Sequence, residues 1–185
     1  MRSRLQDRSE PGRLDGVIRR VLAIAAVVVT ALLLQSTVFG QLRLLGVRPE
    51  LLYLLTIAIA LLEGPNEGAT VGFASGLAQD FLMNEPKGLT ALTLTLLGYS
   101  VGMFRQFIVS PSPLVPTIVV AVGTAAGVAF YEVVSVLLGN FHEQATYGVR
   151  VAVLTALYNA VLTPILYPVL RRITEGSRPR RVVRF

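Results

Sequence analysis

The chain contains no cysteine, a single histidine and few charged residues. Of its 185 residues, 15% are charged, against roughly 25% in an ordinary soluble domain. The lack of cysteine excludes disulfides, thiolate metal sites and cysteine nucleophiles. One histidine without cysteine supplies too few ligands for a structural zinc site. The sequence therefore argues against a water-soluble globule, and we expect no metal site and no bound cofactor.

Positive charge is scarce in the middle of the chain and concentrated at its two ends. Lys and Arg total 17 and Asp and Glu total 11, which gives a formal net charge of +6. The basic residues between positions 21 and 170 are Arg43, Arg48, Lys87, Arg105 and Arg150. Such sparse charge does not make a basic face, so we expect no binding of nucleic acid.

Apolar residues make up 53% of the chain and gather in six segments. A bilayer's hydrocarbon core is about 30 Å thick, which a helix of about 20 apolar residues crosses. The segments that approach this length are 21–39, 51–62, 68–83, 88–104, 114–138 and 148–170. We expect an all-α, polytopic integral membrane protein with six transmembrane helices. Its domain would span residues 18–170, with basic cytoplasmic tails at 1–17 and 171–185.

Details of these segments predict how they are joined and shaped. Segment 51–62 covers only about 18 Å as a helix, so it must borrow flanking residues, tilt little or be shielded by protein. The sequences Glu-Gly-Pro-Asn-Glu at 63–67 and Asn-Glu-Pro-Lys-Gly at 84–88 predict tight hairpins. Pro164 and Pro168 should kink the last turns of the sixth helix.

The distribution of basic residues predicts the orientation in the membrane. With six spans, both tails lie on one side, and that side holds every Lys and Arg except Arg43, Arg48, Lys87 and Arg150. Basic residues are retained in the cytoplasm during insertion, so both termini are assigned there. The first segment is long and no Ala-x-Ala site closes it, which favours an uncleaved signal anchor. The basic tails set the topology, with contact to anionic membrane lipid as the alternative.

Small residues recur every fourth position in several segments. Gly68, Gly72 and Gly76 form one stripe of a helix, and Asp80 continues it. Such faces allow the close approach of another backbone. One interpretation is packing inside the bundle, and the other is docking of a helix from another protein. The same spacing recurs in Gly98 with Gly102 and in Gly123 with Gly127.

Two acidic residues lie well inside the expected spans, where they are costly and often functional. Asp80 lies near the outer end of its helix, which favours a hydrated carboxylate or a hydrogen bond at a helix end over an ion or proton path. Glu132 lies nearer the middle of its span, and we expect it to be buried in the bundle.

The sequence contains no recognisable catalytic constellation. Residues 72–76, Gly-Phe-Ala-Ser-Gly, differ by one residue of spacing from the Gly-x-Ser-Gly motif of rhomboid proteases, and a serine nucleophile needs an activating base. The only histidine, His142, falls in an expected outer loop. No His-Glu-x-x-His motif occurs. We therefore expect no catalytic residues.

A set of short motifs between residues 49 and 99 resembles the bacterial rod shape-determining protein MreD family. The motifs are Pro49-Glu-Leu-Leu, Glu63-Gly-Pro, Gly72-Phe-Ala-Ser-Gly-Leu-Ala-Gln-Asp80, Gly88-Leu-Thr-Ala-Leu92 and Gly98-Tyr99. The stretch that holds them, residues 49–99, covers about a quarter of the chain, while the length, six-segment layout and charged tails agree over all of it. The chain departs from the family pattern in two respects. It has Glu50 where the family often has aspartate, and its ends are rich in arginine.

The resemblance implies a non-enzymatic scaffold of the cell-wall elongation machinery in the bacterial inner membrane, which maintains rod cell shape and lateral peptidoglycan synthesis. The implied partners are MreC and, through it, MreB, RodA and a class B penicillin-binding transpeptidase. The family is also similar in fold to the substrate-binding S components of energy-coupling-factor vitamin transporters. An S component is therefore the alternative function.

The first apolar segment helps to separate these two functions. S components dock through Ala-x-x-x-Ala faces, but Ala23, Ala25 and Ala26 are followed four residues later by Val27, Val29 and Thr30. The outer loops also offer few of the aromatic and polar groups that a ligand site combines. We therefore favour the scaffold.

The scaffold interpretation suggests roles for individual residues. We expect the first three helices to form a groove centred on Gly72 and Gly76 and closed by Asp80, into which a single-span partner packs. Pro49 and Glu50 are expected to start the short second helix, because proline suits a first turn and an acid suits its positive end. A contact in the periplasm is the secondary interpretation of these two residues.

Overall fold

The computed structural model describes residues 11–37, 47, 50–82, 88–107, 114–139 and 145–176. Over these residues the fold is helical, which confirms the predicted all-α class. The elements are α1 (Pro11–Thr37), α2 (Leu51–Glu63), α3 (Pro65–Leu82), α4 (Leu89–Phe104), the short 3-10 helix η1 (Arg105–Phe107), α5 (Leu114–Leu137) and α6 (Ala145–Gly176). Each α-helix matches one of the six predicted segments.

The first and last helices are longer than the apolar segments that predicted them. α1 begins at Pro11, inside the segment 1–17 that was expected to be a tail, and α6 continues to Gly176. Arginine is a good helix former, and a helix need not stop where its apolar residues stop. Proline suits the first turn of a helix, which explains the start of α1.

The short helix α2 lies at the centre of the bundle. All of its residues from Leu51 to Leu62 are buried, and Leu52, Leu54 and Ile57 have no exposed surface. Every other α-helix packs against it. Of the three ways in which so short a segment could be accommodated, shielding by protein is the one observed.

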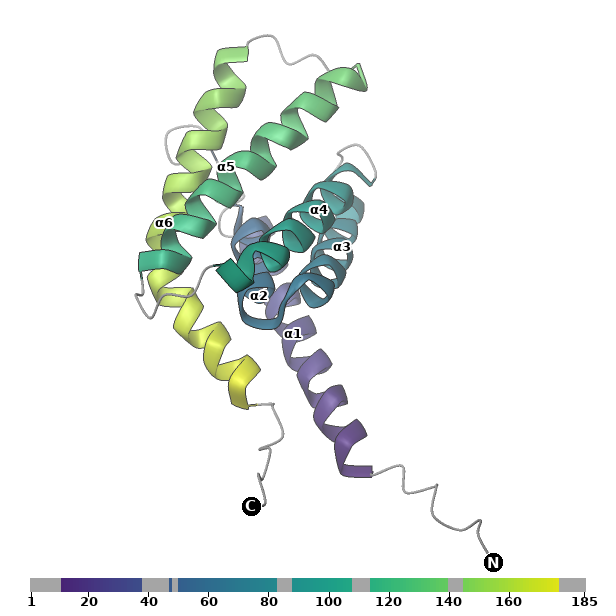
Figure 1. Cartoon of the computed structure of the whole chain (residues 1–185). Helices are drawn as coiled ribbons and strands as arrows, with labels where there is room; N and C mark the ends of the chain where they lie inside the picture. The colour runs from purple at the N-terminus through teal and green to yellow at the C-terminus, as the bar shows by residue number, and fades with distance from the viewer. Residues whose placement is uncertain are drawn as a thin grey trace, which may run out of the picture.

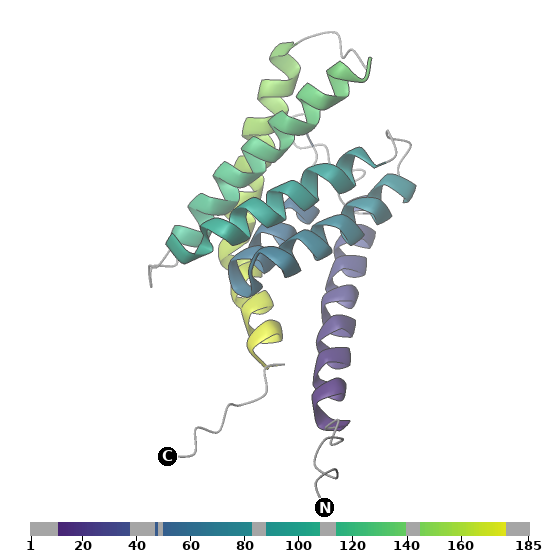
Figure 2. The same cartoon turned by 45° about the vertical axis from the view of Figure 1, so that its right-hand side comes forward.

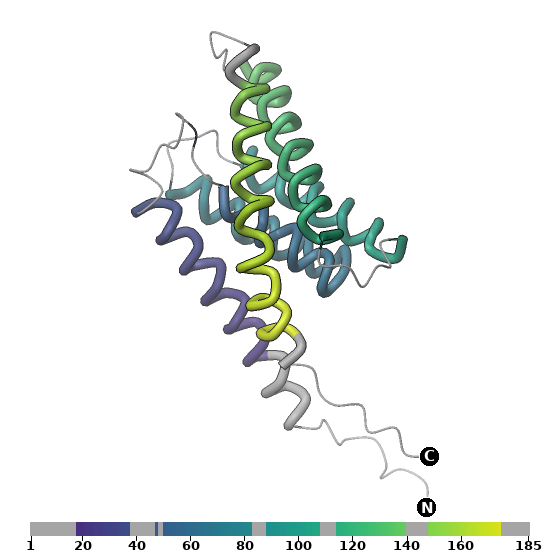
Figure 3. Tube along the Cα trace, turned by 90° about the vertical axis from the view of Figure 1, so that its left-hand side faces the viewer, coloured from purple at the N-terminus to yellow at the C-terminus, as the bar shows by residue number. Residues whose placement is uncertain are grey.

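Four of the remaining helices form two antiparallel pairs around α2. Gly64 alone separates α2 from α3, with a φ of 113°, which confirms the tight turn predicted at 63–67. α3 packs most closely on α4, and α5 on α6 (Figures 1 and 2). α1 stands beside α2 and α6 with much of its surface free of protein contacts (Figure 3).

The start of α1 and the end of α6 lie at the same end of the molecule (Figures 1 and 2). We call this end, which holds Arg20, Arg105 and Arg171, the basic end. The other end of the bundle, which holds Asp80, Gly88 and Leu138, is called the opposite end. α6 changes direction in its last, yellow part (Figure 1), where Pro164 and Pro168 lie inside the helix. A proline removes a backbone hydrogen bond and bends a helix, as the sequence predicted.

Three helical stretches in the described part of the chain are long and apolar enough to cross a membrane. They are Ile18–Thr37, Leu114–Leu137 and Gly148–Thr174, and α2 is a shorter apolar helix. α3 carries several polar residues and α4 has 16 residues, so neither belongs to this group. Six helices are present, while six complete crossings remain a prediction.

Candidate functional site

The glycine stripe of α3 lies against α4, at the closest helix contact in the molecule. A Cβ added to Gly72 would meet the carbonyl oxygen of Leu94, and one added to Gly76 would lie 2.6 Å from the Cα of Ala91. Both are contacts with backbone, which cannot move aside as a flexible side chain can. The stripe therefore serves close backbone packing of α3 on α4, which is the first interpretation of its spacing.

The glycines of α4 complete the same interface. A Cβ added to Gly98 would meet the carbonyl oxygen of Gly68, and one added to Gly102 would meet the backbone of Pro65. Gly68 would also place a Cβ 2.6 Å from the Cβ of Ala60 in α2. α3 is thus held between α2 and α4 along its glycine face.

This packing bears directly on the predicted partner groove. The groove centred on Gly72 and Gly76 is filled by α4 of the same chain, and Asp80 at its end is 1% exposed. Sequence spacing identified a helix-packing face correctly but did not show that α4 occupies it. Docking of a partner at this face remains a prediction, and it requires that the partner displace α4.

Asp80 caps the start of α4 from the neighbouring helix. Its Oδ2 accepts hydrogen bonds from the backbone N–H groups of Gly88, at 2.8 Å, and Ala91, at 3.2 Å. The first N–H groups of a helix lack partners within the helix, and a carboxylate also suits its positive end. Gly88 precedes the helix with a φ of 92°, a conformation open mainly to glycine. This contact is the helix-end hydrogen bond proposed for Asp80 from the sequence.

The start of α2 is the meeting point of polar side chains from three other helices. The backbone N–H of Leu51 donates to Oε1 of Gln35 in α1, at 3.1 Å. Gln79 in α3 donates to the Glu50 carboxylate at 3.4 Å, and Asn159 in α6 donates to the Glu50 carbonyl oxygen at 3.1 Å. These hydrogen bonds hold the first turn of the central helix in place.

Asn159 links this polar cluster to α5. Its amide also donates to Oγ1 of Thr124 at 3.1 Å, and both residues have no exposed surface. We call Gln35, Glu50, Gln79, Thr124 and Asn159 the polar node. Polar residues buried among apolar helices are costly unless they are hydrogen-bonded. The node therefore fixes how α1, α3, α5 and α6 sit around α2.

The sequence analysis singled out Glu50 but missed the other four residues of the node. An amide side chain inside an apolar segment is a usable signal, because polar groups in a membrane core need partners. Gln35, Gln79 and Asn159 all give that signal. The expectation that Glu50 begins α2 agrees with its position directly before Leu51. Pro49 lies outside the described residues.

The glycines of α5 and the acid Glu132 have different surroundings. A Cβ on Gly123 would press on Ile57 at 2.9 Å, and one on Gly127 would press on Tyr53 at 2.7 Å. These contacts pack α5 on α2.

Glu132 is half-buried beside Gly148 of α6. The expectation that it would be buried in the bundle was therefore wrong in degree, because α5 and α6 extend beyond the other helices and leave this position at the edge of their contact.

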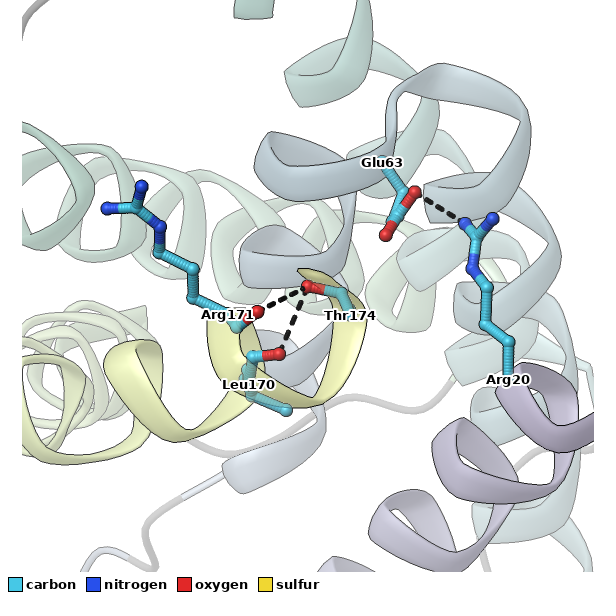
Figure 4. Close-up of polar contacts among 5 residues, drawn as sticks. All are labelled: Arg20, Glu63, Leu170, Arg171 and Thr174. Atoms are coloured by element: carbon cyan, nitrogen blue, oxygen red, sulfur yellow. Dashed lines mark hydrogen bonds and ion pairs between the residues drawn. The ribbon is translucent and has the colours of Figure 1, made fainter. Parts of the chain in front are cut away.

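The basic end carries an ion pair between α1 and α2 (Figure 4). Arg20 pairs with Glu63, whose side chain is 4% exposed. The last turns of α6 lie nearby, where the hydroxyl of Thr174 donates to the carbonyl oxygens of Leu170 and Arg171 (Figure 4). The pair joins α1 to the C-terminal end of α2, and it lies at the basic end of the molecule.

Arg105 reaches the turn between α2 and α3. Its Nη1 atom lies 3.7 Å from the Cβ position of Gly64, and the Glu67 carboxylate lies 3.9 Å from the same position. The basic residue between α4 and α5 is therefore close to the level of Arg20. The described residues place the basic groups of three different segments at one end, as the orientation argument required.

In the described part of the chain, no group of three or more His, Asp or Glu residues could hold a metal ion. The buried acid Asp80 is engaged in capping a helix, and Glu63 in an ion pair. The glycine contacts, the cap and the ion pair described above therefore stabilise the packing of the helices.

These features define a helical membrane protein with a compact interhelical core. The family of the rod shape-determining protein MreD matches this chain over residues 16–175, which is most of its length. The chain belongs to that family, and its role lies in rod shape determination. Searches of curated proteins and of solved structures give no match to the chain.

Proposed function

We propose that this protein is a non-enzymatic scaffold of the cell-wall elongation machinery in the bacterial inner membrane. Its partners would be MreC and, through it, MreB, RodA and a class B penicillin-binding transpeptidase. The observation that carries the proposal is the family match over residues 16–175. The engagement of the buried polar residues in helix packing and capping supports a structural rather than a chemical role.

The orientation of the scaffold follows from its charges. Arg20 in α1, Arg105 in η1 and Arg171 in α6 all lie at the basic end, and basic residues favour the cytoplasmic side. We therefore assign the basic end and both termini to the cytoplasm. The opposite end, with the turn at Leu138 and Gly139, would face the periplasm.

A partner's membrane helix has two ways to bind this scaffold. It could displace α4 from the glycine stripe, or it could lie on a surface that the bundle leaves open. α1 offers such a surface, since only 17% of its apolar window is buried and Leu22, Val29 and Leu33 are more than half exposed. The second way requires no rearrangement of the core, so we favour it for a single-span partner.

The first test is mass spectrometry of the proteins that co-purify with a tagged copy gently solubilised from native membranes. Recovery of MreC, RodA or the transpeptidase, above the level given by an equally tagged unrelated multi-pass protein, supports the scaffold. Recovery of ABC-type ATPases with their coupling protein instead supports the alternative, an S component of a vitamin transporter. Recovery of neither set contradicts the proposed scaffold.

Cross-linking then locates the partner. Because the chain has no cysteine, Val29→Cys on the open face of α1 and Phe73→Cys on the exposed face of α3 can each be the only cysteine. With a single cysteine introduced into the partner's membrane helix, the proposal predicts cross-links by an oxidant or a bis-maleimide from Val29→Cys and none from Phe73→Cys. Cross-links only from Phe73→Cys would contradict binding at α1.

A further inference from the structure

The helices of this protein differ greatly in length. The distance between the charged residues of α6 can be compared with the thickness of a membrane. No charged residue lies between Arg150 and Arg171, and both arginines are exposed. At the helical rise the path between them is about 32 Å, close to the thickness of a hydrocarbon core. Arg150 and Arg171 thus mark the two polar boundaries on the α5–α6 side of the molecule.

The helices on the other side are too short to reach the same outer boundary. α2 has 13 residues, from Leu51 to its end at the Arg20–Glu63 ion pair. Its length is about 20 Å, roughly two thirds of a hydrocarbon core. The polar start of α2 at Glu50 therefore lies about 10 Å below the boundary that Arg150 marks on α6.

The α3–α4 pair ends at a similar depth. α3 has 18 residues and α4 has 16, which correspond to about 27 Å and 24 Å along their axes. Both helices lie strongly inclined to the steeply running α1 and α6 (Figure 2), so they cover even less of the membrane's thickness. In Figure 1 the α5–α6 pair rises beyond the top of α3 and α4.

The outer end of this pair exposes large apolar side chains. Phe81 is 72% exposed and Leu82 is 67% exposed at the end of α3, and Leu92 and Leu96 are exposed along α4. Apolar side chains of this size are suited to contact with acyl chains. Directly beyond them the sequence carries Glu85 and Lys87, and charged residues are costly in hydrocarbon.

We propose that the α3–α4 face thins the outer leaflet of the bilayer next to it and is bordered by phospholipids that match its short apolar height. The bilayer adjusts to the protein because a short hydrophobic surface costs less when lipid thins around it than when polar groups enter hydrocarbon. On the α5–α6 side the bilayer keeps its ordinary thickness. The inference rests on the chain crossing the membrane in the orientation proposed above, and on none of the proposed protein partners.

The depth of Phe81 tests this inference. The chain has no tryptophan, so Phe81→Trp and, as the control on α5 close to the level of Arg150, Phe130→Trp each give a single tryptophan. The proteins are reconstituted alone in phosphatidylcholine vesicles with lipids brominated either near the headgroup or near the end of the acyl chain. Local thinning predicts that headgroup-proximal bromines quench Phe81→Trp about twofold more strongly than chain-end bromines, the same order that is expected for Phe130→Trp.

The opposite order of quenching at Phe81→Trp would show that Phe81 lies deep in a flat bilayer, which overturns the proposal. Quenching by a water-soluble reagent with no quenching by either brominated lipid would also overturn it, because a water-filled dent would then replace lipid. Gel filtration of each variant confirms that it is folded before the vesicles are made.

The chain-length preference of the neighbouring lipids gives a second, independent measurement. We compare Phe73→Trp on the exposed face of α3 with Val122→Trp on the exposed face of α5, which are 53% and 64% exposed. Short-chain phosphatidylcholine should displace brominated lipid from around Phe73→Trp about twofold better than long-chain phosphatidylcholine does, and should show no such advantage around Val122→Trp. Equal preference at the two positions would contradict local thinning.

Discussion

Gly68 of α3 and Gly98 of α4 face each other with no room for a side chain on either. A Cβ added to Gly68 would lie 2.8 Å from the carbonyl oxygen of Gly98, and a Cβ added to Gly98 would meet the carbonyl oxygen of Gly68. The clash is reciprocal and involves backbone on both sides. The two helices approach this closely only because both positions are glycine.

Replacing Gly98 should therefore separate α3 from α4. We expect Gly98→Ala to lower the stability of the solubilised protein by about 1–3 kcal/mol, since overpacking against backbone cannot relax through a rotamer change. The measurement is the loss of the monodisperse gel-filtration peak after heating. Gly148→Ala is the matched control, because its Cβ would make an ordinary contact of 3.6 Å with Glu132. Equal losses for the two variants would contradict the packing argument.

The capping role of Asp80 predicts a graded series. Asp80→Ala should destabilise the protein by about 1–2 kcal/mol, because the N–H groups of Gly88 and Ala91 lose their acceptor. Asp80→Asn keeps a side-chain oxygen and should retain most of that stability. Thermal unfolding measured by circular dichroism compares the three proteins. If Asp80→Asn were as unstable as Asp80→Ala, the charge and not the cap would be the important feature.

The polar node predicts opposite outcomes at two positions one turn apart on α6. Asn159→Leu should destabilise the protein by about 1–3 kcal/mol, because Thr124 and the Glu50 carbonyl oxygen lose a buried partner. Thr155 is also fully buried, but its hydroxyl makes no hydrogen bond within the described residues. Thr155→Val, which preserves shape, should leave the stability unchanged or raise it. Thermal unfolding measured by circular dichroism compares the two variants. A large loss of stability in Thr155→Val would refute this reasoning.

The ion pair between Arg20 and Glu63 should show energetic coupling. Because Glu63 is almost fully buried, Glu63→Gln and Arg20→Gln should each cost about 1–3 kcal/mol. The double variant should cost clearly less than the two single changes added together. A double-mutant cycle on thermal stability measures the coupling, and simple additivity would mean that the pair contributes nothing.

The proposed orientation can be read directly from thiol labelling of single-cysteine variants. Leu138→Cys lies at the opposite end and Arg172→Cys at the basic end, and both positions are exposed. We expect a membrane-impermeant maleimide to label Leu138→Cys on intact spheroplasts and to label Arg172→Cys only after the membrane is permeabilised. The reverse pattern would invert the assigned topology.

The sequence alone determined the helical class, the positions of the six helices and the family. These follow from local properties: apolar runs near 20 residues, turn residues such as Gly64 and Pro65, and short motifs in a fixed order. The sequence also suggested the capping role of Asp80, because a carboxylate near a helix end can accept hydrogen bonds from backbone N–H groups that have no partner within a helix.

Only the tertiary structure decided which surfaces meet. Gly72 and Gly76 form a face that fits another helix, but the spacing carries no information on whether that helix is α4 or a partner. The polar node brings Gln35 together with Asn159, which lie far apart in the sequence, and no local pattern relates them. Hydropathy and residue spacing describe residues that are near one another in the sequence. These contacts join residues far apart in the sequence, and they depend on how whole helices are arranged around α2.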